Sequence, residues 1–156
     1  MTVAHRSGTI AERQAGASGS RPVMLVTFDV PVREDAAAVA VDSAVESGQP
    51  LLLVNIIDLP IRPMTASWGQ EVIVFEDVDA SLRAPAELAH SLAVAVERLR
   101  IVSPRPMRAL LELVGERRPG LLVLGADAAR MRRRKYHKAA RTIREGASCL
   151  VWIPAE

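Results

Sequence analysis

One stretch decides the fold of this chain: Leu121-Leu122-Val123-Leu124-Gly125-Ala126-Asp127-Ala128. It is followed by a basic segment from Arg130 to Lys138, a helix-like run from Ala139 to Gly146 and a second apolar run from Cys149 to Ile153. Strand, glycine turn, helix and strand in this order are typical of a parallel α/β unit. In such units a ligand binds at the loop that follows the strand. Here that loop is rich in arginine and poor in glycine.

The same order of strand, helix and strand occurs earlier in the chain. Residues 23–28 and 51–57 are apolar on both faces, as central parallel strands that are covered on both faces must be. The first of these strands stops at Asp29 and is followed by a helical period over residues 34–47, which ends at Gly48. Strand, helix and strand within this length predict a right-handed βαβ unit.

Between residues 59 and 83 the pattern is less regular, and we expect a short strand over residues 71–76 because the segment is β-branched and aromatic. Residues 84–99 carry a helical period that opens near Pro85, and residues 100–103 read as a short edge strand. A further helix is expected over residues 107–117. The alternation predicts an α/β fold with a doubly wound, open, parallel five-stranded sheet of the Rossmann-like type.

Length and composition favour a single domain. We expect residues 1–21 of the 156-residue chain to form a flexible tail and residues 22–156 to form the α/β domain. The formal net charge is only +2, so the distribution of charge matters more than its sum. The single cysteine, Cys149, excludes an internal disulfide framework, and no apolar run is long enough to cross a bilayer. Since residues 1–20 lack a signal-peptide pattern, the expected location is the cytoplasm, without a membrane partner.

The pattern resembles the universal stress protein (UspA-like) family over about residues 22–154. The resemblance rests on a lone aspartate after the first strand, Asp29, and on a glycine after the fourth, Gly125. It also rests on the final helix, turn and strand, in which Ala147-Ser148-Cys149-Leu150 occupies the family's Ala-x-Cys-Pro turn and Val151-Trp152-Ile153-Pro154 follows. The resemblance implies a fold of the adenine nucleotide alpha hydrolase-like, universal stress protein type, and a role in the stress response.

The ATP-binding branch of that family carries a glycine motif: Gly, two residues, Gly, nine residues, then Gly-Ser or Gly-Thr. Such glycines let backbone N–H groups approach phosphates at a helix N-terminus. Here the motif is degenerate, because Gly125 is followed by Ala128 at the second position and by His137-Lys138 or Lys138-Ala139 at the third. Asp29 matches the family's aspartate near the nucleotide, and Ile56 matches an apolar residue that lines the adenine pocket.

Basic side chains offer a substitute for the missing glycines. The segment from Arg130 to Arg144 holds eight Lys or Arg residues and His137, and it is either a solvated helix face or an anion site. Asp29 and Asp127 could pair for acid/base chemistry, although a capping role for Asp29 is the simpler interpretation. The three histidines are far apart in sequence and suggest no metal site. The candidate nucleotide- or anion-binding residues are Asp29, Ile56, Gly125, Asp127, Arg130 and Lys138.

Three functional hypotheses follow. The first is a non-catalytic, universal stress protein-like regulatory or ligand-sensing protein that forms a homodimer through its C-terminal strand. Its ligand would be ATP, another adenine nucleotide or a phosphate-containing small molecule, although the degenerate glycines argue against tight ATP binding. The second is slow ATP hydrolysis or phosphate transfer, with Arg130 and Lys138 on the phosphate. The third is an adaptor whose basic loop docks on an acidic protein; nucleic acid is not the expected partner, since only Tyr136 interleaves with the charges.

Overall fold

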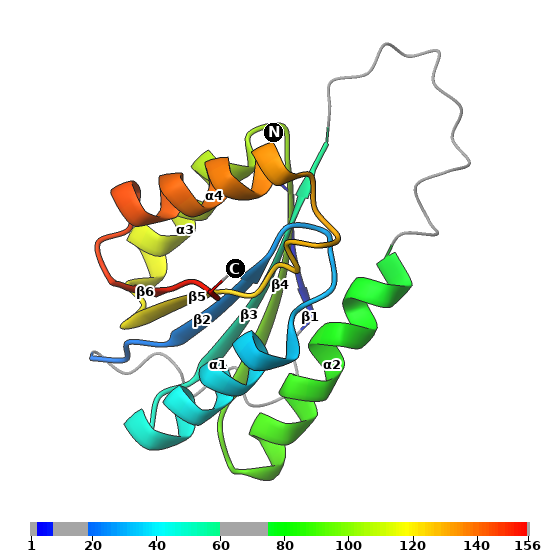
Figure 1. The fold of residues 1–156 in the computed structure, drawn as a ribbon. Coiled ribbons are helices and arrows are strands. Elements are labelled where there is room, and N and C mark those ends of the chain that lie inside the picture. Colours follow the sequence, from blue (N-terminus) through cyan, green and yellow to red (C-terminus); the bar gives the residue numbers. More distant parts are fainter. Residues whose placement is uncertain (1–2, 8–18, 60–74, 156) are drawn as a thin grey trace.

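Helices cover both faces of a single sheet in the computed structural model, which describes residues 3–7, 19–59 and 75–155 (Figure 1). The sheet order is β1-β4-β3-β2-β5-β6. Its strands are β1 (Val3–Ser7), β2 (Val23–Thr27), β3 (Leu51–Asp58), β4 (Val96–Ser103), β5 (Leu121–Leu124) and β6 (Leu150–Trp152). Strands β2 to β6 are parallel, and β1 joins β4 in the antiparallel sense. The predicted doubly wound sheet of five parallel strands is therefore confirmed, with β1 as an addition at one edge.

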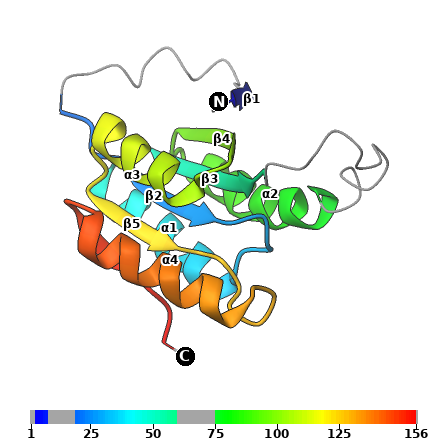
Figure 2. The same cartoon turned by 90° about the horizontal axis from the view of Figure 1, so that it is seen from above.

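The four helices divide into two layers. They are α1 (Glu34–Ser47), α2 (Phe75–Ser91), α3 (Pro106–Arg117) and α4 (Arg133–Gly146). Buried residues of α1 and α2 form one apolar cluster with one face of the sheet, and those of α3 and α4 form a second cluster with the other face. In the view from above, α3 and α4 lie over the same face (Figure 2). Because both faces are covered, every residue of β2 is buried, as its mostly apolar sequence predicts.

Two predicted segments differ from the structure. The flexible tail predicted for residues 1–21 is wrong for Val3–Ser7, which form β1 along β4, while residues 8–18 lie outside the described part. Of the strand predicted over 71–76, residues 71–74 also lie outside it, and Phe75 and Glu76 open α2 instead.

Of the helix predicted over residues 84–99, residues 84–91 are helical, and both predicted bounds are wrong. Helix α2 begins at Phe75, contains Pro85 in its interior and ends at Ser91, and residues 96–99 belong to β4. The leucines that suggested the period, Leu88 and Leu92, are about half exposed. The face that packs on the sheet follows a different set with helical spacing: Val78, Leu82, Pro85 and Ala89. Strand β4 lies between β3 and β1, so it is not the edge strand that its predicted length indicated.

The turn after β5 is joined to the turn after β2 by backbone hydrogen bonds. The N–H of Gly125 donates to the carbonyl of Val26 at 2.7 Å, and the carbonyl of Gly125 accepts from Arg33 at 2.9 Å. An isolated bridge pairs Val32 with Ala126. A Cβ on Gly125 would lie 2.7 Å from Leu25 Cδ1 and 3.0 Å from Val32 Cγ1. Glycine is therefore required here by the close packing of two turns.

Gly125→Ala should destabilise the protein by about 1–3 kcal/mol, because the added methyl group overpacks a buried turn. Chemical unfolding followed by circular dichroism measures this loss. Gly115→Ala is the matched control: Gly115 lies in α3, is exposed and has no atom within 4 Å of an added Cβ, so the change should be neutral or stabilising by about 0.5–1 kcal/mol. Equal stability of the two variants would contradict the packing argument.

Candidate functional site

A cavity of about 520 Å³ opens at the carboxyl edge of the sheet, between the first turns of α3 and α4. Its lining comes from strand ends, from the turn before α3 and from one flank of α4. The lining residues are Phe28, Asp58, Pro104, Arg105, Pro106, Met107, Arg108, Met131, Arg134, Lys135, Lys138 and Ala139. The carboxyl edge of the parallel strands is where ligands bind in doubly wound folds.

The floor of this cavity is apolar. Phe28, Met131 and Ala139 are buried members of the core beneath it, and Met107 packs against the same core. Methionine side chains are flexible and polarisable and make favourable contacts with aromatic rings. Such a floor suits a flat, apolar ring system.

The rim is cationic. Five Lys or Arg residues line the cavity against one carboxylate, Asp58. Asp58 lies 3.7 Å from Lys135 Nζ, and Arg108 Nε lies 3.0 Å from Glu112. In contrast, Arg134 and Lys138 have no ion-pair partner among the described residues. Their charge is available to an anion.

The N-termini of α3 and α4 also favour an anion at this cavity. The residues before α3 and α4, Arg105 and Arg132, make no side-chain capping bond, and neither helix has an acidic residue in its first turn. By comparison, α1 begins with Glu34 and Asp35. A helix N-terminus carries partial positive charge and exposed N–H donors, so it favours a negative partner. Both helices that border the cavity lack one within their own first turn.

Asp29 lies where the sequence predicts it, after β2. Its backbone is left-handed, with φ 56°, and its N–H donates to Oδ1 of buried Asn55 at 2.9 Å. Its Oδ1 atom is buried and accepts no hydrogen bond from the described residues. Burial raises the pKa of the Asp29 carboxyl above its ordinary value of 3.8, and the charges of Arg100 and Lys135 offset part of that rise. Asp29 is a strained, incompletely satisfied group near the cavity wall.

The other predicted site residues do not lie together at this cavity. Ile56 is only 1% exposed and belongs to the core, and Gly125 is buried beneath Val32, so neither lines this cavity. Asp127 Oδ1 accepts from the N–H of Ala129 at 3.0 Å and shapes the turn before α4. Arg130 is exposed and lies 3.9 Å from Asp77 of α2. Of the six candidates, only Lys138 lines the cavity.

The basic segment is mostly helix and not the predicted loop. Helix α4 begins at Arg133, so the positions expected for the final Gly-Ser pair, His137 to Ala139, lie in its second turn. Their backbone N–H groups are within the helix and cannot cradle a phosphate. The glycine motif is therefore absent in geometry as well as in sequence.

Sequence reasoning missed the side of the cavity that α3 provides. Arg105, Pro106 and Met107 follow β4, whose length was underestimated, so the end of that strand was not seen as part of the binding edge. The available signal was the Pro104-Arg105-Pro106 sequence, which places a cation directly between a strand end and a helix start.

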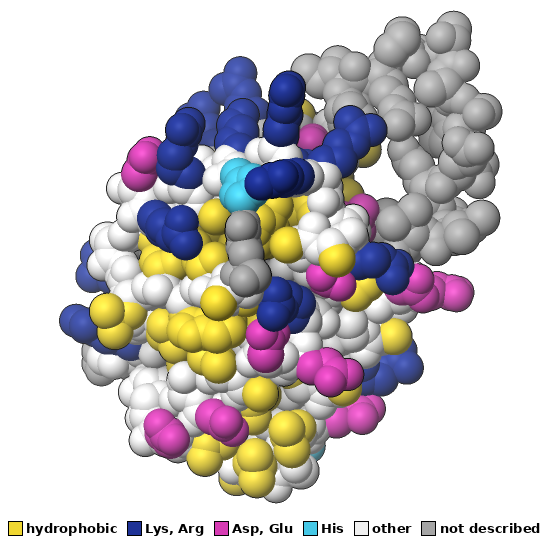
Figure 3. Space-filling model, in the orientation of Figure 1, with side chains coloured by type: hydrophobic (Ala, Val, Ile, Leu, Met, Phe, Trp, Pro, Cys, Tyr) yellow, Lys and Arg dark blue, Asp and Glu magenta, His cyan; other side chains and the backbone are white. Residues whose placement is uncertain are grey.

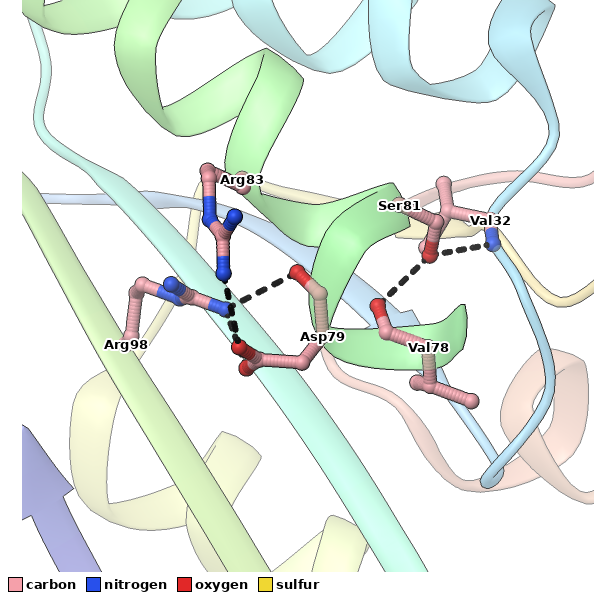
Figure 4. Close-up of polar contacts among 6 residues, drawn as sticks. All are labelled: Val32, Val78, Asp79, Ser81, Arg83 and Arg98. Atoms are coloured by element: carbon pink, nitrogen blue, oxygen red, sulfur yellow. Dashed lines mark hydrogen bonds and ion pairs between the residues drawn. The ribbon is translucent and has the colours of Figure 1, made fainter. Parts of the chain in front are cut away.

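A second cavity, of about 370 Å³, lies on the other face, against α2, β3 and β4. Its lining holds two acidic and two basic residues, so their charges balance, and one acidic residue forms ion pairs. Asp79 accepts from Arg98 at 2.7 Å and also pairs with Arg83 at 3.6 Å (Figure 4). Nearby, Ser81 Oγ accepts from the N–H of Val32 at 3.1 Å and donates to Val78 O at 2.7 Å, which links α2 to the turn after β2. The cavity beside α3 and α4 is thus the better site for an anion.

Among residues 3–7, 19–59 and 75–155, no group of three or more His, Cys, Asp or Glu side chains could hold a metal ion. In the same part of the chain, no helix is long and apolar enough to cross a membrane.

The fold is that of the universal stress proteins, as the sequence predicts. A universal stress protein family structure from Burkholderia pseudomallei matches with a TM-score of 0.65 and 15% identity, over 90% of this chain and 100% of its own. A universal stress protein from Archaeoglobus fulgidus in complex with dAMP matches with a TM-score of 0.59 and 15% identity, over 85% and 96%. One from Arabidopsis thaliana with AMP bound gives 0.53 and 18%, over 85% and 89%. No family model and no curated protein matches the sequence.

Asp29→Asn should stabilise the protein at neutral pH and lose this effect near pH 4. A carboxyl group with a raised pKa binds its proton more tightly in the folded state than in the unfolded state. The ionised carboxylate therefore lowers the free energy of unfolding once the pH rises above 3.8, and the full cost is reached above the raised pKa. Asparagine keeps the left-handed backbone accessible. Chemical unfolding at about pH 4 and pH 7 measures the difference.

Asp35→Asn is the control of opposite sign. The hydrogen bond from Arg33 lowers the pKa of Asp35, so that carboxylate adds stability above its ordinary pKa and loses it as the pH falls. Asp35→Asn should therefore weaken the protein at pH 7, and this loss should fade only as the pH falls below the ordinary value of 3.8. The same sign of change for both variants would contradict the assignment for Asp29.

Proposed function

We propose that this chain is a divergent universal stress protein that binds a phosphate-bearing adenine nucleotide without turning it over and acts as a ligand-sensing regulatory protein in the cytoplasmic stress response. The observation that carries the proposal is the cavity between α3 and α4, with its apolar floor and cationic rim. Its volume, about 520 Å³, is within the range of ~300–1,000 Å³ found for small-molecule sites.

The two halves of a nucleotide fit the two halves of the cavity. An adenine ring would lie on Phe28, Met107 and Met131, where it loses little polar hydration. Its phosphate would lie at the rim, between Arg134 and Lys138, near the positive ends of α3 and α4. The bound dAMP and AMP of two structural neighbours support an adenine nucleotide as the ligand class.

A monophosphate suits this site better than ATP. The glycine cradle that would hold a triphosphate by backbone N–H groups is replaced by α4 itself. What is left for the phosphate is a small number of side-chain cations at one rim. This arrangement can neutralise one phosphate group without orienting a chain of three.

The charges of the rim favour binding over catalysis. Asp58 is the one carboxylate that lines the cavity, and it lies 3.7 Å from Lys135. A general base must be free to take up a proton at the reacting group, and an ion-paired carboxylate is poorly suited to do so. We therefore assign Asp58 the role of positioning Lys135.

The nucleotide proposal predicts the behaviour of two paired variants. Arg134→Gln/Lys138→Gln should weaken AMP binding at least about tenfold, since each charge-assisted contact contributes roughly 1.5–3 kcal/mol. Isothermal titration calorimetry with AMP, ATP and adenosine measures this. Adenosine should bind more weakly than AMP, ATP no more tightly than AMP, and each nucleotide should be recovered unchanged in the presence of magnesium.

Arg141→Gln/Arg144→Gln provides the matched control, because it removes the same charge from α4 outside the cavity. It should bind AMP as the unmodified protein does. Equal AMP affinity in both double variants, or release of phosphate from ATP above a heat-killed sample, would refute the proposal.

We also propose a homodimer through β6. Leu150 at the start of this strand is 74% exposed, and the outer edge of β6 has no strand partner among the described residues. An apolar edge strand can pair with a further strand. A second copy of this chain is therefore the simplest partner that would cover the edge of β6. The sheet would then continue across the two-fold axis through an antiparallel pair of β6 strands, since that axis reverses the strand direction.

Leu150→Glu should convert the dimer to a monomer, because two like charges would face the same edge. Size-exclusion chromatography with light scattering gives the mass directly. Leu88→Glu, which places the same charge on a half-exposed leucine of α2, should leave the mass unchanged. A monomeric unmodified protein, or a dimer that survives Leu150→Glu, would exclude this interface.

A further inference from the structure

Helix α4 has a second cationic flank that does not line the cavity. Arg133, His137, Arg141 and Arg144 follow one another at helical spacing, and all are exposed. Residues three or four apart lie on the same side of a helix, so these four form one strip, the outer strip. The cavity takes its α4 residues from the flank that faces α3, and none belongs to the outer strip.

The arginines of the outer strip differ in their ion pairing from several arginines of α2, β4 and α3. Arg83 and Arg98 pair with Asp79, and Arg117 pairs with Glu97 at 2.7 Å. Arg133, Arg141 and Arg144 form no ion pair within the described residues; the contact of Arg133 is with His137, at 3.4 Å. Their charge is not used inside the molecule.

The two helical layers carry opposite charge. Helices α1 and α2 together hold eight acidic residues and one arginine, whereas α4 holds six Lys or Arg and one acidic residue. In the space-filling view, Lys and Arg side chains gather over α4, and most acidic ones lie lower, over α1 and α2 (Figure 3). An anionic polymer would therefore be attracted to the α4 side and repelled by the other.

The outer strip lacks the means to read bases. Tyr136, the aromatic residue of α4, is only 3% exposed, so its ring cannot stack on a base. Proteins that bind single-stranded nucleic acid combine cations with exposed aromatic side chains. A bare phosphate chain requires only a row of cations.

We propose that the outer strip binds a linear chain of phosphates, for which inorganic polyphosphate is the matching probe. The chain would lie along α4 and contact Arg133, Arg141 and Arg144 in succession. It would also supply the negative charge that the first turn of α4 lacks. This site is distinct from the nucleotide cavity, and its occupancy does not depend on the function proposed for that cavity.

The test uses the full chain with long-chain polyphosphate, tripolyphosphate and poly(U) RNA, at several salt concentrations. Long-chain polyphosphate should bind more tightly than tripolyphosphate, per molecule and per phosphate, and should raise the melting temperature. Arg141→Gln/Arg144→Gln should lower its affinity at least about tenfold and reduce the salt slope by about 1.4, since each contact to a single-stranded polyanion contributes ~0.7. The same variant should keep its AMP affinity.

Arg134→Gln/Lys138→Gln is the reciprocal control, and it should lose AMP while keeping most of its polyphosphate affinity. Thermal melts of both double variants confirm that each is folded. Polyphosphate binding that survives the loss of Arg141 and Arg144, or that disappears only with Arg134 and Lys138, would overturn the outer strip. Poly(U) binding as tight per phosphate as polyphosphate would overturn the ligand class and identify the strip as a nucleic-acid surface.

Discussion

The close packing of two turns at Gly125 fixes the carboxyl edge of the sheet in this protein. The turn after β5 reaches the turn after β2 only because no Cβ separates Gly125 from Leu25 and Val32. The two turns exchange backbone hydrogen bonds at the topological switch point of the sheet. The cavity lies to one side of this contact, between α3 and α4 above Phe28. A glycine that resembles part of a phosphate-binding motif thus serves packing, and the cavity lies elsewhere on the same edge.

Charge and packing have opposite effects on the stability of helix α4. Three consecutive cations at the start of α4, Arg133 to Lys135, lie at the positive end of the helix, where like charge is unfavourable by a few tenths of a kcal/mol to ~1 kcal/mol each. Burial of the opposite face, through Tyr136, Ala139, Ala140 and Ile143, more than offsets that cost. The helix is therefore stable by packing and destabilised by charge. An anion that binds at the first turn of α4 removes this unfavourable charge interaction. Binding should therefore raise the stability of the folded protein.

The sequence predicted the parts of the fold that depend on local pattern. Runs that are apolar on both faces located β2, β3 and β5, because only strands covered on both faces need them. The Gly48 stop located the end of α1. The prediction failed where a helical spacing of apolar residues continues past the end of a helix into a strand. Leu88, Leu92 and Val96 have helical spacing, yet the chain turns between the last two, with Ala93 in the left-handed region. For the candidate site, the sequence pointed to the carboxyl edge of the sheet, where the cavity lies. It did not indicate the α3 side of the cavity, which depends on how two distant helices pack and which no local period encodes.

Replacing a backbone cradle by side chains changes the kind of recognition that is possible. Backbone N–H groups in a glycine loop are fixed in place and lose no rotamer freedom when a phosphate binds. Arg134 and Lys138 are long and exposed, and each costs on the order of 1–2 kcal/mol of side-chain entropy when it is ordered. Their attraction is also screened by salt, since both lie at the surface. A site built in this way selects for charge more than for shape, which favours a sensor of anionic ligands over an enzyme that must align a γ-phosphate for attack.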